Sequence, residues 1–156
     1  MMTRISGEVF IAAPVEEVFD LVADERNEPR YNPRIEHVRK LGGEPVGAGA
    51  RFVAEPSGTG KRGELILTIR EYDRPFLLHN VVESSYMRVD GTLTFEEVGG
   101  GTRLAWDWDT RLVGPMRLLT PLLGLVGPSW ERRNWVALKD YVEAHRHHGV
   151  NGGSRP

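Results

Sequence analysis

Residues 129–145, SWERRNWVALKDYVEAH, form the one long segment of helical spacing, and they follow a series of strand-like segments. Ser129 is a suitable N-cap residue. The apolar stripe predicted for this helix has the i, i+4, i+7, i+8, i+11 spacing of one buried face: Trp130, Asn134, Ala137, Leu138 and Tyr141. Glu131 and Glu143 are expected on the outer surfaces. We therefore expect one long amphipathic helix that covers another layer.

The region before this helix, residues 35–112, is almost entirely strand and turn. Glycine and proline turn signals divide it at short intervals: Gly42–Gly43, Gly47–Gly49, Gly58–Gly63, Asp73–Pro75 and Gly99–Gly101. With residues 3–11, whose apolar positions alternate, this pattern predicts an antiparallel meander of about seven strands.

Parity along each predicted strand assigns side chains to a core face. The members of this face are Leu65, Leu67, Ile69, Leu77, His79, Val81, Met87, Val89, Gly91, Leu93, Phe95, Leu104, Trp106, Trp108 and Thr110. Asp107 and Asp109 fall on the opposite, solvated face, where we expect cross-strand pairing with arginines. This parity places the imidazole of His79 among core residues.

The N-terminal part adds two short helices after the first strand. Pro14 suits the first turn of a helix that continues to Val22, and residues 24–33 can form a second short helix at most. The resulting order predicts an α+β fold, in which one curved antiparallel sheet is covered by the C-terminal helix. Such a fold leaves a concave apolar space suited to a small molecule.

Composition narrows the function classes. The chain of 156 residues with a net charge of −2 predicts one domain without the basic excess of a nucleic-acid-binding surface. It has no cysteine, residues 1–11 lack the apolar core of a signal peptide, and no apolar run approaches the length that spans a bilayer, so we expect a cytoplasmic protein. We also expect a monomer or a homodimer. Residues 1–147 are predicted to be the domain, and residues 148–156 a disordered tail.

Several stretches resemble a known family. They are residues 12–20 (AAPVEEVFD), 31–33 (YNP), 44–52 (EPVGAGARF), 70–75 (REYDRP) and 91–103 (GTLTFEEVGGGTR). Together they are similar to the polyketide cyclase/dehydrase branch of the START-like (SRPBCC, Bet v 1-type) superfamily. The resemblance implies a helix-grip fold, with a deep hydrophobic pocket between the sheet and the last helix. Members of this family bind lipids, hormones or polyketides.

The residues expected at this pocket are mostly aromatic. They are Tyr31, Phe52, His79, Met87, Trp106, Trp108, Trp130 and Asn134. His79 is the candidate catalytic residue, because a histidine with a pKa near neutrality can move a proton to or from a bound carbonyl or enol. The alternative interpretations are a hydrogen-bonded core histidine for His79 and plain core packing for the two indoles of residues 106 and 108.

Other motifs do not indicate a cofactor or a metal. Gly58–Gly63 matches GxGxxG but is followed by a strand, whereas a dinucleotide site needs a helix there. His145, His147 and His148 lie at a helix end beside a glycine-rich tail, with no cysteine anywhere in the chain. We expect neither a cofactor nor a structural metal.

The sequence supports two hypotheses for function and two interpretations of the apolar segment 115–126. The first hypothesis is binding or transport of a small apolar molecule, such as a lipid, a polyketide or another aromatic metabolite. The second is a cyclase or dehydratase that uses polar groups of the pocket. Residues 115–126 are interpreted as a lid over the pocket entrance, with weak contact with a lipid surface as the alternative.

Overall fold

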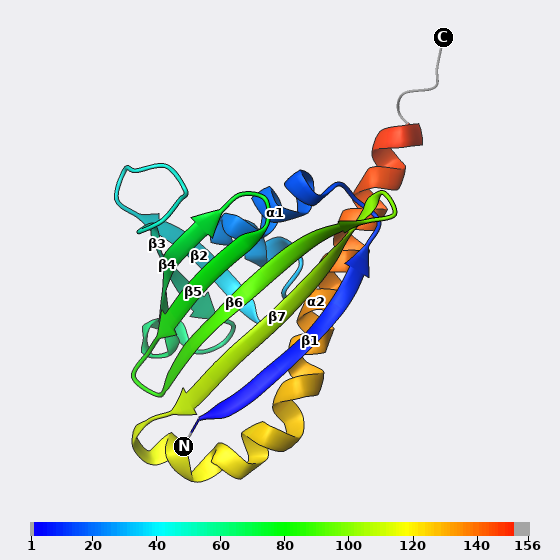
Figure 1. Cartoon of the computed structure of the whole chain (residues 1–156). Coiled ribbons are helices and arrows are strands. Elements are labelled where there is room, and N and C mark those ends of the chain that lie inside the picture. Colours follow the sequence, from blue (N-terminus) through cyan, green and yellow to red (C-terminus); the bar gives the residue numbers. More distant parts are fainter. Residues whose placement is uncertain (1, 152–156) are drawn as a thin grey trace.

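The structure, a computed structural model, describes residues 2–151, with side chains through residue 146 (Figure 1). Its strands are β1 (Thr3–Ile11), β2 (Ile35–Leu41), β3 (Arg51–Pro56), β4 (Leu65–Asp73), β5 (Leu77–Glu83), β6 (Met87–Val98) and β7 (Gly101–Leu112). Its α-helices are α1 (Val15–Ala23) and α2 (Thr120–Asn151), and its 3-10 helices are η1 (Glu25–Arg30), η2 (Gly60–Gly63) and η3 (Gly114–Leu119).

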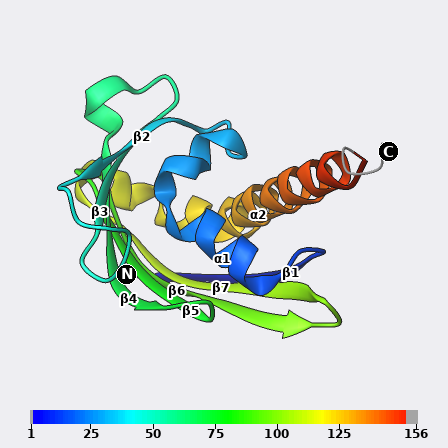
Figure 2. The same ribbon diagram turned by 90° about the horizontal axis from the view of Figure 1, so that it is seen from above.

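The strands form one antiparallel sheet of 7 strands in the order β1-β7-β6-β5-β4-β3-β2. Each strand from β2 to β7 pairs with its neighbour in sequence, and β1 pairs with β7, so β1 and β2 form the two edges of the sheet. The sheet curves, and α1 and α2 lie on the same side of it (Figure 2). The predicted α+β fold, a curved sheet with a long C-terminal helix and two short helical segments after the first strand, is confirmed.

We call the side of the sheet that faces α2 the inner face, and the strand register divides it into cross-strand rows. The buried row is Tyr72, Leu78, Leu93, Trp106 and Gly7. The polar row is the next row on the same face, and it consists of Ile69, Asn80, Gly91, Trp108 and Ile5. The open row, one step further, is Phe52, Leu67, Val82, Val89 and Thr110.

The core lies over the buried row and is completed by both α-helices. Phe19 of α1 makes edge-to-face contacts with Phe95 and Tyr72, with ring centroids 5.0 and 5.2 Å apart. From α2, Trp135 stacks on Trp106 with ring centroids 5.8 Å apart. Because each fully buried aromatic or aliphatic side chain contributes roughly 1.5–3 kcal/mol, this layer fixes α2 on the sheet.

The buried stripe of α2 differs from the predicted one. Trp135, Leu138 and Val142 are buried, whereas Trp130 is 52% exposed. Leu138 is buried as predicted, but the centre of the buried stripe is displaced by one residue, which is a rotation of about 100° on a helix of 3.6 residues per turn. Apolar residues occupy both helix faces, and packing on the sheet selects the face that carries Trp135.

The predicted start of this helix at Ser129 is also wrong, since α2 begins at Thr120 and continues through Gly127 and Pro128. Gly127 packs against β1, and a Cβ at this position would lie 2.7 Å from the Cδ1 atom of Ile5. Contact with β1 therefore holds the chain in helical form across the proline (Figure 1). α2 also continues beyond residue 147, the predicted end of the domain, and residues 152–156 of the predicted tail lie outside the described residues.

The predicted parity of β5 is reversed by the strand register. His79 pairs with Thr92, and its neighbour Leu78 pairs with Leu93 of the buried row. His79 therefore faces away from α2, on the outer face, together with Leu77 and Val81. The error arises because β5 carries apolar residues on both faces, and because the polar Asn80 occupies the inner one.

A substitution at Gly91 tests whether the polar row is closely packed. A Cβ at Gly91 would overlap the indole of Trp108 and lie 2.5 Å from the backbone oxygen of Asp107. We expect Gly91→Ala to lower the free energy of unfolding by about 1–3 kcal/mol, measured by urea denaturation. Gly43→Ala is the control, because a Cβ there meets nothing within 4 Å; equal stability of the two variants would contradict this packing.

Candidate functional site

The inner face is closed over the middle of the buried row and accessible over the middle of the open row. Leu78 and Leu93 of the buried row are 0% and 1% exposed. In the open row Leu67, Val82 and Val89 are only half-buried, although the register points them toward the side of α2. Met87, at the start of β6, is also half-buried. Apolar surface is thus left available on the concave side of the sheet.

Trp108 stands at the boundary between the closed and the accessible parts. Its ring lies over Gly91, where the Cε3 edge occupies the space of a side chain. Its opposite edge donates a hydrogen bond from Nε1 to Oε2 of Glu131 at 3.0 Å. The glycine in β6 and the carboxylate on α2 therefore fix the orientation of a half-buried indole.

Glu131 accepts a second indole hydrogen bond on the same oxygen. Trp135 Nε1 donates to Glu131 Oε2 at 3.1 Å. Burial raises the pKa of Glu131 above its usual value of 4.5, and the charge of Glu28 acts in the same direction. The two indole donors and the charge of Arg34 lower the pKa, but burial dominates. This side chain is an acid that holds its proton more tightly than an exposed glutamate does.

Asn80 supplies a second polar group on the inner face. It is 4% exposed, and its Oδ1 is fully buried without a hydrogen-bond partner among the described residues. In the polar row, only Gly91 separates it from Trp108. A buried amide without partners carries a desolvation cost of about 1–3 kcal/mol, which a bound polar group can remove.

The segment around η1 adds further acids and a phenol. Tyr31 packs against the core, with its ring 6.2 Å from that of Tyr141 on α2. Burial raises the pKa of Tyr31 well above its usual value, and Glu28 and Glu25 add to the shift. Burial followed by the charge of Glu28 also raises the pKa of Glu25. Ionisation of these groups is therefore suppressed at this end of the site.

The structure brings some of the predicted site residues together and separates others. Trp106, Trp108 and Met87 lie on the inner face, and Phe52 is fully buried at the end of the open row. Asn134 and Tyr31 are half-buried on α2 and at the end of η1. Trp130 stacks instead under the guanidinium of Arg34, whose Cζ is 4.3 Å from the ring centroid.

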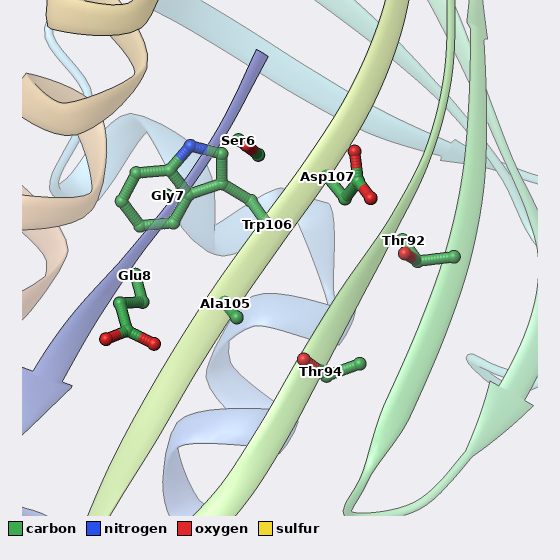
Figure 3. Close-up of a pocket in the computed structure, with 8 residues that line it drawn as sticks. All are labelled: Ser6, Gly7, Glu8, Thr92, Thr94, Ala105, Trp106 and Asp107. Atoms are coloured by element: carbon green, nitrogen blue, oxygen red, sulfur yellow. The ribbon is translucent and has the colours of Figure 1, made fainter. Parts of the chain in front are cut away.

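His79 lies apart from this group. Its Nε2 is 2.7 Å from Oδ1 of Asp90 on β6, on the outer face. Near it, an open groove of about 440 Å³ is lined by Thr92 and Asp107 among others (Figure 3). The figure shows the Trp106 indole over β1 near Gly7, away from Thr92 and Thr94. A ligand on the inner face would therefore not reach His79.

A second pocket of about 360 Å³ lies between α1, η1 and α2. Its lining includes Leu21, Asn27, Tyr141 and Val142. Its outer rim is bridged by the ion pair between Arg146 and Glu17. The pocket lies beside the C-terminal half of α2, near Tyr31, whose ring is 6.2 Å from that of Tyr141.

The apolar segment 115–126 does not pack as a lid. No residue of η3 is buried, and Leu118 and Leu125 are each 79% exposed. Leu122 is 51% exposed. Contact of this segment with a lipid surface therefore stays a prediction, and within residues 2–151 no helix is long and apolar enough to cross a membrane.

Sequence reasoning missed three members of this site. Glu131 was expected outside, and neither Asn80 nor Trp135 was among the predicted site residues. The signal for Glu131 and Trp135 was their i, i+4 spacing, which puts a carboxylate and an indole on one helix face. In the part of the chain with described side chains, no group of three or more acidic, histidine or cysteine residues could hold a metal; the side chains of His147 and His148 lie outside it.

Comparison with known proteins places this geometry in a family. The family model described as "Polyketide cyclase / dehydrase and lipid transport" matches residues 2–143. No match was found among curated proteins. The family match covers both the sheet and the part of α2 that carries Glu131 and Trp135.

Solved structures with the same fold include several distant relatives. The protein TTHA0849 from Thermus thermophilus is 24% identical, with a TM-score of 0.75 over 91% of this chain and 98% of that one. A START superfamily protein from Mycobacterium smegmatis is 18% identical, with a TM-score of 0.75 over 90% and 97%. The di-domain ARO/CYC BexL from the BE-7585A biosynthetic pathway is 21% identical, with a TM-score of 0.72 over 91% of this chain and 47% of that one. At these identities the likeness shows the fold alone.

The raised pKa of Glu131 predicts a pH-dependent effect of Glu131→Gln. The folded state binds the proton more tightly than the unfolded chain, so this residue's contribution to the free energy of unfolding falls as the pH rises above 4.5. Glutamine carries no charge, so the variant should gain stability relative to the wild type from acidic to neutral pH in urea denaturation. The exposed Glu97→Gln is the control, and a Glu131→Gln difference that stays constant with pH would contradict the assignment.

Proposed function

The chain belongs to the polyketide cyclase/dehydrase and lipid transport family, and from this premise we propose that it binds a small apolar molecule on the open part of its inner face. One observation carries the proposal. Leu67, Val82 and Val89 point toward the side of α2 and remain accessible, while Leu78 and Leu93 of the buried row are closed. Accessible apolar side chains on a concave face are typical of ligand sites.

Trp108 indicates which apolar molecules fit best. It is half-buried and held in place by Gly91 and Glu131, so it presents a rigid ring at the edge of the open row. Aromatic side chains favour offset stacking or edge contacts with other rings, worth about 0.5–1.5 kcal/mol beyond the buried area. We infer that a ring-bearing metabolite is preferred to a saturated chain.

The fluorescent probe 1-N-phenylnaphthylamine, a neutral aromatic molecule, tests this proposal. We expect it to bind the wild type with a rise in fluorescence. Val82→Trp fills the open row and should weaken binding at least about tenfold, which corresponds to about 1.4 kcal/mol. Urea denaturation of the variant checks that it is folded.

The matched control is Glu83→Trp, which adds the same side chain to the next residue of β5. Glu83 is exposed and faces the outer side, so its replacement should leave binding unchanged. Absence of binding to the wild type, or equal binding to both variants, would overturn the proposal. If the probe binds as expected, native mass spectrometry of the protein after incubation with a cell extract would identify the natural ligand.

The second candidate function is a dehydratase or cyclase of the polyketide type, and Glu131 is the observation that favours it. Its pKa is raised and it lies beside the apolar surface, as a general acid or base requires. In a dehydration the carboxylate would remove a proton from the carbon next to a carbonyl. The same proton would then protonate the leaving hydroxyl, which departs as water.

A model reaction separates this candidate from simple binding. The β-hydroxyketone 4-hydroxy-4-phenylbutan-2-one loses water to form an enone whose absorbance can be followed. If the protein is a dehydratase for such compounds, the wild type should accelerate this step and Glu131→Gln should be about a hundredfold slower. Asp140→Asn, on the exposed side of α2, should keep the wild-type rate. A wild-type rate equal to that of buffer, or one unchanged in Glu131→Gln, would exclude Glu131 from such chemistry.

A further inference from the structure

The carboxylate of Glu131 is only half satisfied by the protein. Both indole hydrogen bonds, from Trp108 and Trp135, reach Oε2. Within the described residues Oε1 has no hydrogen-bond partner, and it is not among the fully buried unpaired atoms, so it keeps accessible surface. An acceptor that is held rigidly in weakly polar surroundings and lacks a partner favours a ligand that donates a hydrogen bond.

The charged groups around Glu131 do not supply that donor. Arg34 is the nearby cation, but its guanidinium stacks on Trp130 with Cζ 4.3 Å from the ring centroid. Glu28, on η1, is an acid, and its side chain accepts a hydrogen bond from Asn32 at 3.0 Å. The donor for Oε1 must therefore come from a bound molecule or from water.

A second unsatisfied group lies at the other end of the same indole. The Nε1 edge of Trp108 points to Glu131, while its Cε3 edge lies over Gly91, the neighbour of Asn80 in the polar row. The Asn80 side chain is 4% exposed and has no hydrogen bond to the described residues. Its Nδ2 also keeps accessible surface, because only Oδ1 is fully buried and unpaired. Trp108 thus separates an acceptor on α2 from an amide on β5.

Building on the proposed binding function, we propose that this site selects a flat hydroxyaryl ketone, whose hydroxyl donates to Glu131 Oε1 and whose carbonyl accepts from the amide of Asn80. The aromatic body lies along Trp108 and against the open row. Trp108 and Trp135 are positioning residues, because they hold Oε2 and leave Oε1 free. Phenolic ketones are a much narrower ligand class than apolar molecules in general.

A pair of matched probes tests the hydroxyl contact by isothermal titration calorimetry near neutral pH. The probes are 6-hydroxy-2-acetonaphthone and 6-methoxy-2-acetonaphthone, which differ only in the donor. We expect the wild type to bind the hydroxy compound about tenfold more tightly, as one added hydrogen bond predicts. Glu131→Gln should lose this preference, and Asp140→Asn on the exposed side of α2 should keep it. Asn80→Leu should weaken both probes to a similar extent.

The outcomes separate this inference from the proposed function. If the wild type binds both probes equally, or Glu131→Gln keeps the preference, the hydroxyl contact is overturned while apolar binding stands. If Asn80→Leu leaves both affinities unchanged, the carbonyl contact is overturned. If the wild type binds neither probe nor 1-N-phenylnaphthylamine, both the proposed function and this inference fail. The comparison of the two probes on the wild type does not depend on any variant folding.

Discussion

The packing of α2 on the sheet is the constraint on which the rest of the structure depends. A curved sheet with an apolar inner face is stable in water only when that face is covered. α2 covers it through Trp135, Leu138 and Val142, and the stack of Trp135 on Trp106 anchors the helix over β7. Because one helix is narrower than the sheet, it closes the middle of the buried row and leaves Leu67, Val82 and Val89 of the open row accessible. The candidate site is the part of the inner face that this helix does not cover.

The same helix also carries the polar chemistry of the site. Glu131 lies one turn before Trp135, so the stack that anchors α2 also places a carboxylate beside Trp108. The two indole donors limit the cost of burying an acid, since hydrogen bonds to the charged form offset part of the desolvation. One contact thus anchors the fold and also positions the acid beside the surface where we propose that a ligand binds.

The order and type of the secondary-structure elements could be predicted from the sequence because they depend on local patterns. Turn residues mark the ends of the strands, and alternation correctly assigned Leu93, Trp106 and Trp108 to the inner face. Parity failed on β5, where both faces carry apolar residues and the inner one carries Asn80. The stripe of α2 failed for a similar reason, since two adjacent helix faces are both partly apolar. In each case local periodicity allowed two solutions, and contact with another element selected one.

The sequence by itself determined the α+β class, the curved sheet with its C-terminal helix, and the place of Gly58–Gly63 between two strands. These depend on turn chemistry and on periodicity, which act over a few residues. Only the tertiary structure decided that Glu131 is inside, that His79 is outside, and that Asn80 lies near Trp108. The physical reason is that the rotation of a helix and the register of a strand are set by close packing between residues far apart in the chain.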